Sequence, residues 1–461
     1  MNVQYCRIAA DFPRAVTMAR HRSMRAVAAC ILTVAASACH ESALLPISAG
    51  TGPTPELPKP VKKLIPTTNV AKAIGWTAGQ TPAVAEGMVV SRFAEGLDHP
   101  RWLYVLPNGD VLVAETNGPK RPDDEKGIKA FFKRWFLKKA GGATPSANRI
   151  TLLRDADGDG KAEVREVFVA GLNSPFGMAL IGNDLYVANT DALMRFPYQP
   201  GVTKIMAVGE KVLDLPGGTL NHHWTKSLLA NADGTKLFVG VGSNSNAAEN
   251  GIDKEVGRAS IWEITPGTRA HREFATGLRN PVGMVLEPES GALWTVVNER
   301  DELGSDLVPD YLTSVRDGAF YGFPYSYFGQ HVDDRVKPQR ADLVASAIAP
   351  DYALGPHTAS LGLAVAKGSA LPARFANGMF IGQHGSWNRS PRSGYTVIFV
   401  PFDKGKPAGA PLDMLTGFLN DNGDAMGRPV GVVLDRLGAL LVADDIGNVI
   451  WRVSKPAAVQ R

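Results

Sequence analysis

The stretch Gly277–Glu299, "GLRNPVGMVLEPESGALWTVVNE", decides the fold class of this chain. It passes from two polar residues and a proline into an apolar run, turns at Gly291, and continues into a second apolar run. Two short apolar runs on either side of a glycine turn are typical of a β-hairpin. The stretch therefore predicts two neighbouring β-strands, with Arg279 and Asn280 at the entrance to the first.

Five other segments align with this hairpin, which makes it one copy of a repeat. They begin at Gly96, Gly171, Gly217, His357 and Met426. Recurrence at intervals of about 50–80 residues indicates a repeat architecture, and the 48 Gly and 32 Pro among 461 residues favour many short strands. Six units of four strands predict an all-β fold, a six-bladed β-propeller, whose innermost strands surround a central channel. A β-sandwich in which the Gly-Leu strings recur by chance is the alternative.

One column of the aligned repeats is polar and stands at the entrance to each first strand. It contains His99, Ser174, His223, Asn280, Ala359 and Arg428. A residue before proline favours extended geometry, so we expect the column to lead straight into the strands. If these strands are the inner ones, the column forms a ring at one mouth of the channel, where a ligand site is expected. Ordinary loop residues are the alternative, which suits His99 and Ser174 better than the others.

The N-terminal region reads as a targeting segment followed by a linker. Residues 1–39 combine several arginines with the apolar run Ala26–Ala38 and small residues at its end, which is typical of an export signal. Cys39 stands where a lipoprotein signal would carry its lipid, so a lipid anchor is an open alternative. Residues 40–84 are predicted to be a Pro-rich linker, and 85–457 the propeller. All three cysteines lie in 1–39, so the body has no disulfide option.

The net charge of +4 comes from residues 1–38, which hold five arginines and one acid, so the remainder is neutral. This excludes the basic footprint of a nucleic-acid-binding protein. A short insertion between the first two repeats, Gly127–Gly142, predicts a basic amphipathic helix. Such a helix can lie on an anionic membrane surface, and packing against the propeller is the alternative.

Two acidic stretches are candidates for Ca²⁺. Asp155–Glu166, "DADGDGKAEVRE", matches a calcium loop, but its flanks predict strands rather than helices, which favours an acidic hairpin turn. Asn298–Asp306, "NERDELGSD", follows the second strand of its repeat and lies near Arg279 and Asn280 in the alignment. No P-loop, GxSxG, HExxH or Rossmann motif occurs in a usable context, which argues against nucleotide hydrolysis and nicotinamide chemistry.

Several motifs resemble the sorbosone dehydrogenase family, which is related to the soluble sugar dehydrogenases that use pyrroloquinoline quinone (PQQ). They are "NHHWTKSLLANADGTKLFVGVGSNSN", "HGSWNRSPRSGY" and "GRPVGVV", and the resemblance spans residues 85–455. It implies a six-bladed propeller with PQQ and Ca²⁺ at one mouth of the channel. It also implies an exported protein, periplasmic or anchored to the outer membrane of a Gram-negative bacterium.

The resemblance assigns roles to ring residues. His223 matches the catalytic base, and Arg279, beside Asn280, matches the arginine next to the quinone carbonyl. Arg428 matches a basic residue that pairs with a PQQ carboxylate. A neutral histidine suits a base, and arginine suits carboxylates because of its bidentate geometry.

Further residues follow from the same resemblance. Glu299, Arg300 and Asp301 fall in the segment whose main-chain carbonyls hold Ca²⁺. The segment "HGSWNR" lies where the family supplies another cation and an aromatic to the cofactor, and Trp387, Asn388 and Arg389 are the alternatives for this role.

The implied function is PQQ- and Ca²⁺-dependent oxidation of a sugar or aldehyde, of the L-sorbosone or aldose type. Electrons would pass to a quinone or cytochrome. Lys226-Ser227 replaces a Gly-Arg pair of the glucose-oxidising branch, which puts glucose in doubt. A Ca²⁺-dependent propeller lactonase and a non-catalytic binding propeller are the alternatives. A lactonase would need several acids in the ring, where only Asp98 is found, against Arg279 and Arg428.

Overall fold

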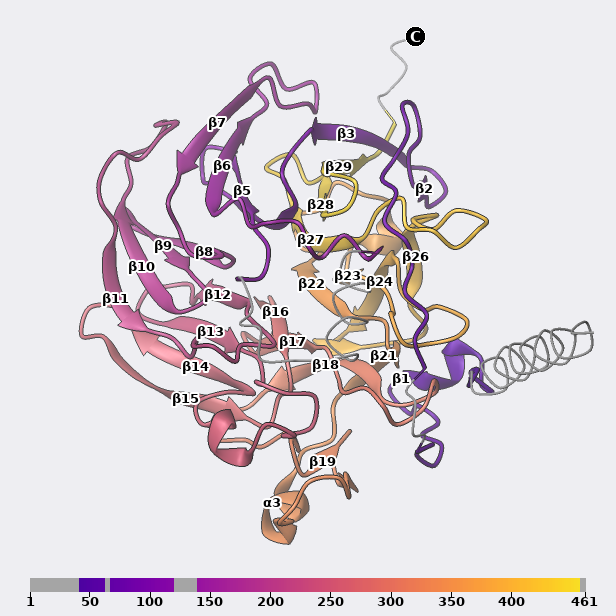
Figure 1. The fold of residues 1–461 in the computed structure, drawn as a ribbon. Coiled ribbons are helices and arrows are strands. Elements are labelled where there is room, and N and C mark those ends of the chain that lie inside the picture. Colours follow the sequence, from indigo (N-terminus) through magenta and orange to yellow (C-terminus); the bar gives the residue numbers. More distant parts are fainter. Residues whose placement is uncertain (1–40, 63–66, 120–138, 457–461) are drawn as a thin grey trace, which may run out of the picture. The chain divides into compact units, whose positions relative to one another are not determined.

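Six β-sheets stand around a central axis in the computed structural model, which describes residues 41–62, 67–119 and 139–456 (Figure 1). Each sheet has at least four strands, and neighbouring strands within a sheet are antiparallel. The predicted six-bladed β-propeller is therefore confirmed.

Blades 1 to 3 each consist of four consecutive strands. Blade 1 comprises β4 (Pro100–Val105), β5 (Val111–Glu115), β6 (Arg149–Arg154) and β7 (Val164–Val169). Blade 2 comprises β8 (Met178–Ile181), β9 (Asp184–Ala188), β10 (Ala192–Pro197) and β11 (Glu210–Asp214). Blade 3 comprises β12 (Lys226–Ala230), β13 (Leu237–Val241), β14 (Ser260–Thr265) and β15 (Ala270–Thr276).

Blades 4 to 6 recruit strands from distant parts of the chain. Blade 4 comprises β16 (Pro281–Leu286), β17 (Leu293–Val297), β18 (Pro309–Val315) and β21 (Tyr352–Pro356), with β1 (Thr51–Gly52) at its edge. Blade 5 comprises β22 (Ser360–Val365), β23 (Gly378–Gln383), β24 (Thr396–Asp403) and β26 (Leu412–Thr416). Its edges carry β2 (Ala83–Val84) and β25 (Lys406–Pro407). Blade 6 comprises β27 (Pro429–Leu434), β28 (Leu440–Asp444), β29 (Val449–Ser454) and β3 (Val89–Glu95).

Hydrogen bonds between the two ends of the repeat region close the circle. Strand β3 precedes blade 1 in the chain but pairs with β29 of blade 6, with Val89 opposite Ser454. The first and last parts of the propeller therefore share one sheet.

The first strand of every repeat is the innermost one, at the end of its sheet beside the inner strands of the neighbouring blades. Three of these strands carry a glycine at the same aligned position, Gly283, Gly362 and Gly431, and Gly177 holds that position directly before β8. A Cβ on Gly362 would lie 2.1 Å from the Val430 carbonyl oxygen of the next blade. The aligned glycines therefore reflect the close approach of neighbouring inner strands.

The described parts of residues 40–84, which the sequence predicts to be a linker, lie along the propeller. We call residues 43–62 and 67–84 the N-terminal strap. Strand β1 pairs with β21 and β2 with β26, and the indole N–H of Trp76 donates to Asp444 at 2.7 Å. Main-chain pairing to an open sheet edge needs no alternating side-chain pattern, so the sequence carries little sign of it.

The acidic stretch forms a hairpin loop between β6 and β7, as its flanking sequence predicts. The carboxylates of Asp155, Asp157, Asp159 and Glu163 lie within 4.8 Å of one another. Asp155 accepts the main-chain N–H groups of Gly158 and Gly160. Glu166, which fills the last position of the calcium-loop pattern, lies instead on β7. These bonds are those of an acidic turn.

Two predictions fall outside the described residues: the export signal with Cys39, and residues 127–138 of the amphipathic helix. Within the described ranges, no helix is long and apolar enough to cross a membrane.

Candidate functional site

The polar column forms a ring at the entrance of the six inner strands. Its predicted extended geometry is wrong at two of the pre-proline positions, since φ is 54° at His99 and 43° at Ser174. The cause is a bond to the preceding blade. The His99 N–H donates to Asn448 Oδ1 at 3.1 Å, and the Ser174 N–H donates to Asn148 Oδ1 at 2.9 Å. An asparagine of the previous blade thus holds each of these residues in the left-handed region.

Apolar side chains close the channel next to the ring. Phe176, Val282, Leu361 and Val430 are buried and form one cluster with Trp102 and Trp224, so each blade contributes one residue. The indole of Trp224 meets the Phe176 ring edge-on at 6.0 Å between centroids. The ring therefore surrounds a mouth with an apolar floor.

His223 has a defined tautomer. Its Nδ1 faces the Ser243 carbonyl at 2.8 Å and the Ser243 hydroxyl at 3.0 Å. That hydroxyl donates its own proton to the Ser245 carbonyl at 2.7 Å, so both atoms act as acceptors. Nδ1 must therefore carry the proton, and Nε2 holds the free lone pair. Burial, then the charge of Arg279, holds the pKa of His223 well below its ordinary value, so the imidazole of His223 is neutral.

Arg279 is buried and held mainly by carbonyl oxygens. Its Nε donates to the Asn246 carbonyl at 3.1 Å, and Nη1 donates to the Asn298 and Glu299 carbonyls at 3.2 and 2.6 Å. Its Nη2 donates to Asn246 Oδ1 at 3.0 Å and lies 3.7 Å from the Asp301 carboxylate. Of the five guanidinium N–H groups, one on Nη2 has no hydrogen-bond acceptor among the described residues.

Asp301 joins Arg279 to blade 5, and we call Asn246, Arg279, Asp301, His357 and Asn388 the Asp301 cluster. The Asp301 carboxylate accepts a hydrogen bond from the Asn388 side-chain amide at 2.8 Å and lies 3.4 Å from His357 Nδ1. The oxygens Asn388 Oδ1 and, in the ring, Asn280 Oδ1 are buried and accept no hydrogen bond from the described residues.

His357 should make the stability of the fold depend on pH. Burial opposes its charged form, but the Asp301 carboxylate outweighs this and raises the pKa of His357. This stabilisation is fully present below the unfolded pKa of about 6.5 and is lost as pH rises through the folded pKa. We expect the difference in unfolding free energy between the parent and His357→Gln, from urea denaturation, to be larger at pH 6 than at pH 9. A difference that grows with pH would contradict this ion pair.

A second cluster lies across the mouth, where blades 5, 6 and 1 meet. Asp445 accepts Arg101 Nη1 and His384 Nε2, each at 2.8 Å, and Arg428 Nε at 3.2 Å; His99 Nε2 lies 3.5 Å away. We call these five residues the Asp445 cluster. Burial, followed by the competing charges of Asp445 and the arginines, lowers the pKa of His99 and of His384 to about 4.

The Asp445 cluster therefore has excess positive charge and unused donors. Two arginines face one carboxylate while both histidines are neutral. Arg101 Nε is buried without a partner, and within the described ranges no group accepts from the terminal nitrogens of Arg428. A cluster of this kind suits a ligand that carries carboxylates.

The two clusters occupy opposite arcs of the ring. The Asp445 cluster belongs to blades 6 and 1 with His384 of blade 5, and His223 and the Asp301 cluster lie on blades 3 to 5. Between the arcs, blades 2 and 5 contribute the small ring residues Ser174 and Ala359.

In the segment predicted to hold a metal, residues 299–301, the side chains make ion pairs while some main-chain carbonyls stay available. The guanidinium of the buried Arg300 pairs with the Glu299 carboxylate at 3.0 Å and with the Asp333 carboxylate at 3.1 Å. The side chains of Glu299 and Arg300 are therefore bonded to each other. The Asp301 carbonyl already accepts Asn246 Nδ2 and Arg335 Nη1. The Glu299 carbonyl accepts one bond, and the Arg300 carbonyl accepts none from the described residues.

The "HGSWNR" segment reaches the site through His384 and Asn388; of the three alternatives Trp387, Asn388 and Arg389, it is Asn388 that contacts the Asp301 carboxylate. Trp387 is 45% exposed. The buried Arg389 instead donates to the Ser305 and Pro391 carbonyls, both at 2.9 Å. The structure therefore does not bring Arg389 together with the ring.

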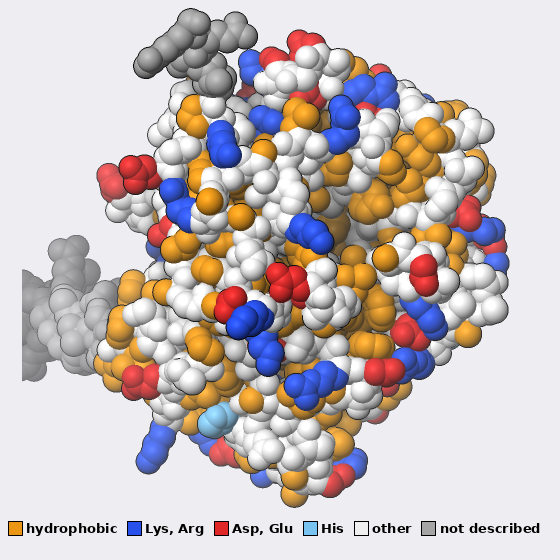
Figure 2. All heavy atoms as spheres, turned by 180° about the vertical axis from the view of Figure 1, so that it is seen from behind, with side chains coloured by type: hydrophobic (Ala, Val, Ile, Leu, Met, Phe, Trp, Pro, Cys, Tyr) orange, Lys and Arg blue, Asp and Glu red, His pale blue; other side chains and the backbone are white. Residues whose placement is uncertain are grey.

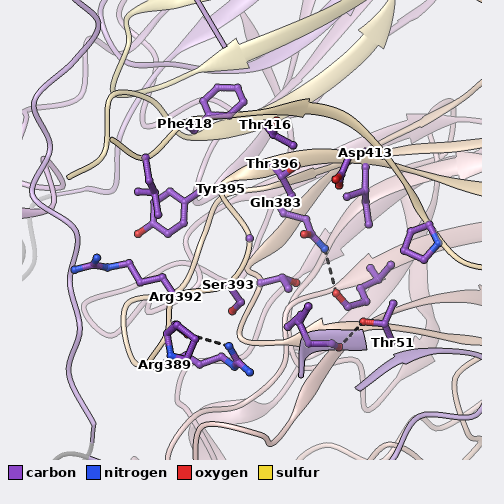
Figure 3. A pocket seen from close by; sticks show the side chains of 18 of the residues that line it. Thr51, Gln383, Arg389, Arg392, Ser393, Tyr395, Thr396, Asp413, Thr416 and Phe418 are labelled. Carbon is purple, nitrogen blue, oxygen red and sulfur yellow. Dashed lines mark hydrogen bonds between the residues drawn. The ribbon is translucent and has the colours of Figure 1, made fainter. Parts of the chain in front are cut away.

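A cavity of about 540 Å³ lies behind this segment, between the strap residues 45–47 and blade 5 (Figure 3). Arg389, Ser393 and Gln383 line it, but no ring residue does. The polar groups at its wall bond within the protein, as Ser393 Oγ does with the Pro356 carbonyl at 2.8 Å. We place the site at the ring, where the unused donors converge.

Sequence reasoning missed Arg101, Asn246, His357, His384 and Asp445. Three of them follow the second strand of their repeat, where the aligned copies end in "GSNSN", "GQH" and "ADD". A second polar column was therefore visible beside the first.

The face of the molecule seen in Figure 2 has no region of a single charge sign. On the face seen in Figure 2, Lys and Arg side chains alternate with Asp and Glu over the described residues.

Comparisons with known proteins identify the family of the chain. The chain matches the TrAA12-like family over residues 146–327 and 328–456. It is 32% identical over 241 residues to an uncharacterized protein of Borreliella burgdorferi, covering 52% of this chain and 62% of that protein. It is 24% identical over 438 residues to the PQQ-dependent pyranose dehydrogenase of Coprinopsis cinerea, covering 81% of this chain and 55% of that enzyme. The chain thus spans less than two thirds of the length of either relative.

Solved structures share the fold. The holo PQQ domain of the Coprinopsis cinerea pyranose dehydrogenase superposes with a TM-score of 0.65 at 21% identity, over 84% of this chain and all of that domain. The calcium structure of a Trichoderma reesei family AA12 protein superposes with a TM-score of 0.66 at 19% sequence identity, over 81% of this chain and 97% of that chain. The Escherichia coli soluble aldose sugar dehydrogenase superposes with a TM-score of 0.54 at 17% sequence identity, over 80% of this chain and all of that chain. The predicted relation to soluble PQQ-dependent sugar dehydrogenases is confirmed, and the chain belongs to the TrAA12-like family.

Proposed function

We propose that this chain is an exported dehydrogenase that oxidises a sugar or an aldehyde in its hydrated or hemiacetal form, with PQQ and Ca²⁺ at the channel mouth. The observation that carries the proposal is the pairing of a neutral histidine beside Arg279 with the cationic Asp445 cluster at one mouth. The substrate class is that of L-sorbosone or an aldose, and a quinone or cytochrome would accept the electrons.

The residues present fit PQQ. Its carboxylates need fixed cations, and the Asp445 cluster has excess positive charge, with free donors on Arg101 and Arg428. Its quinone end needs a cationic donor, and Arg279 retains one N–H. The unpaired Asn280 oxygen is a further polar group at this end.

The fit to Ca²⁺ rests on oxygen atoms without partners. The Arg300 carbonyl accepts no bond among the described groups, and the Glu299 carbonyl and Asn388 Oδ1 retain lone pairs. Neutral oxygens of this kind are common ligands of a hard cation. The carboxylates of Glu299 and Asp301 already face arginine.

Removing hydrogen from a hemiacetal means taking a proton from oxygen and a hydride from carbon. When bound, PQQ supplies the hydride acceptor, with Ca²⁺ polarising its carbonyl. His223 Nε2 accepts the hydroxyl proton, and Ser243 keeps the imidazole in the tautomer that makes this possible. Arg279 directs a cationic N–H toward the oxygen that gains negative charge. The apolar floor limits water beneath the reacting atoms.

The alternatives are less well supported. A lactonase would need free carboxylates around a metal, whereas Asp301 and Asp445 are each surrounded by cations and Asp98 lies 3.9 Å from Arg149. A binding module would not require the defined tautomer of His223.

Titration of the purified apoprotein with PQQ and Ca²⁺ tests the proposal. We expect the absorption of bound quinone to appear with saturation and to bleach on addition of an oxidisable sugar or aldehyde. Ca²⁺-dependent lactone hydrolysis without PQQ would show a lactonase. Sugar binding without any bleaching would show a binding propeller.

A further inference from the structure

Asn246, in the loop after β13, contacts Arg279 and the Asp301 main chain through one side chain. Its Oδ1 accepts Arg279 Nη2 at 3.0 Å and the Asp301 N–H at 2.8 Å, and its Nδ2 donates to the Asp301 carbonyl at 3.1 Å. Its own carbonyl accepts Arg279 Nε at 3.1 Å. One residue of blade 3 thus makes four hydrogen bonds to two residues of blade 4.

These bonds determine which guanidinium N–H of Arg279 stays available. Asn246 takes two of the four N–H groups that are bonded, and the Asn298 and Glu299 carbonyls take the others. The carbonyls hold one side of the guanidinium, and Asn246 holds the other side. Without the Asn246 amide, Nη2 would have two free N–H groups and only the Asp301 carboxylate, at 3.7 Å, to turn toward.

Only an amide of this length makes this set of contacts. Both Oδ1 partners are donors and the Nδ2 partner is a carbonyl, so the orientation of the amide is defined. Aspartate would retain the acceptor but lose the donor to the Asp301 carbonyl. Serine is too short to span both groups. The Asn246 N–H is itself fixed to Glu249 at 2.9 Å.

We infer that Asn246 is a positioning residue for the reaction: it orients Arg279 and the Asp301 loop as one unit and reserves one Arg279 N–H for the substrate or cofactor oxygen. The inference rests on the proposed function. Asn246 does not need to touch either ligand to act in this way.

The test compares Asn246→Ala and Asn246→Asp with the matched control Asn250→Ala. Asn250 lies in the same loop and donates to the Asn244 carbonyl at 3.1 Å, without contacting Arg279. With PQQ and Ca²⁺ added, we expect Asn246→Ala to lower kcat by about ten- to a hundredfold, since small misplacements of catalytic groups have effects of this size. KM for the sugar and the melting temperature should stay close to those of Asn250→Ala. Asn246→Asp should fall between the parent and Asn246→Ala.

A double-mutant cycle provides the decisive comparison. In an Arg279→Ala background, Asn246→Ala should add little to the loss of kcat, because the residue through which it acts is gone. Equal losses in both backgrounds, or the same loss in Asn250→Ala, would overturn the inference.

A crystal structure of Asn246→Ala gives a readout that needs no activity. We expect the Arg279 guanidinium to turn or to lose order while the blade 4 strands stay in place. An unchanged Arg279 would overturn the positioning role. Failure of the proposed function is a separate outcome, since the parent would then neither bind PQQ nor turn over.

Discussion

His223→Gln should lower kcat by about two to four orders of magnitude, the usual contribution of a general base. The free lone pair of His223 Nε2 is maintained by Ser243, and glutamine cannot replace it as a base. PQQ should still bind, because the Asp445 cluster is unchanged. Stopped-flow reduction of the bound quinone by sugar measures the loss, and equilibrium titration measures the retained binding.

The pH profile provides an independent check. A base must be neutral to act, and burial together with Arg279 holds the pKa of His223 well below 6.5. The acid limb of kcat/KM in the parent should therefore fall well below pH 6.5. His222→Gln is the matched control and should keep nearly normal turnover. If His222→Gln loses activity and His223→Gln does not, the base is His222.

Arg428→Ala should weaken PQQ binding by about 2–3 kcal/mol, the effect of losing a charge-assisted pair in a partly buried site. This corresponds to a rise in Kd of about thirty- to a hundred-and-fiftyfold. Arg428→Lys should recover only part of the loss, because lysine lacks the forked donor geometry. Arg101→Ala should behave like Arg428→Ala, since both guanidinium groups face Asp445. Isothermal titration with PQQ in excess Ca²⁺ measures each Kd.

Arg452→Ala is the matched control for charge. Arg452 also belongs to blade 6 but pairs with Asp435 at 2.8 Å, away from the ring. Its loss should leave the Kd for PQQ unchanged. If Arg428→Ala and Arg452→Ala bind PQQ equally well, Arg428 is not a carboxylate anchor.

The hairpins and the ring could be predicted from the sequence because both depend on local order. Apolar runs around a glycine turn define the strands, and alignment of the copies places His223, Asn280 and Arg428 in one column. The propeller closure then brings the column together at the axis.

The partners of the ring residues could not be predicted in the same way. Asp445 of blade 6 and Arg101 of blade 1 meet only because the circle closes, and His384 reaches Asp445 from the neighbouring blade 5. Arg300 and Arg389 lie in polar stretches like those of the site, but each is used within the protein because acceptors surround it. Which arginines remain free depends on the positions of carbonyls, which the sequence does not show.

The apolar floor gives the mouth a single entrance, and this has a consequence for the order of events. Under the proposed function, whatever enters would leave by the same opening, so the oxidised product would have to depart before an electron acceptor could reach the same place. The proposed function therefore predicts that sugar and electron acceptor bind in turn and compete for the same opening. A large excess of either partner would then slow the other half of the cycle.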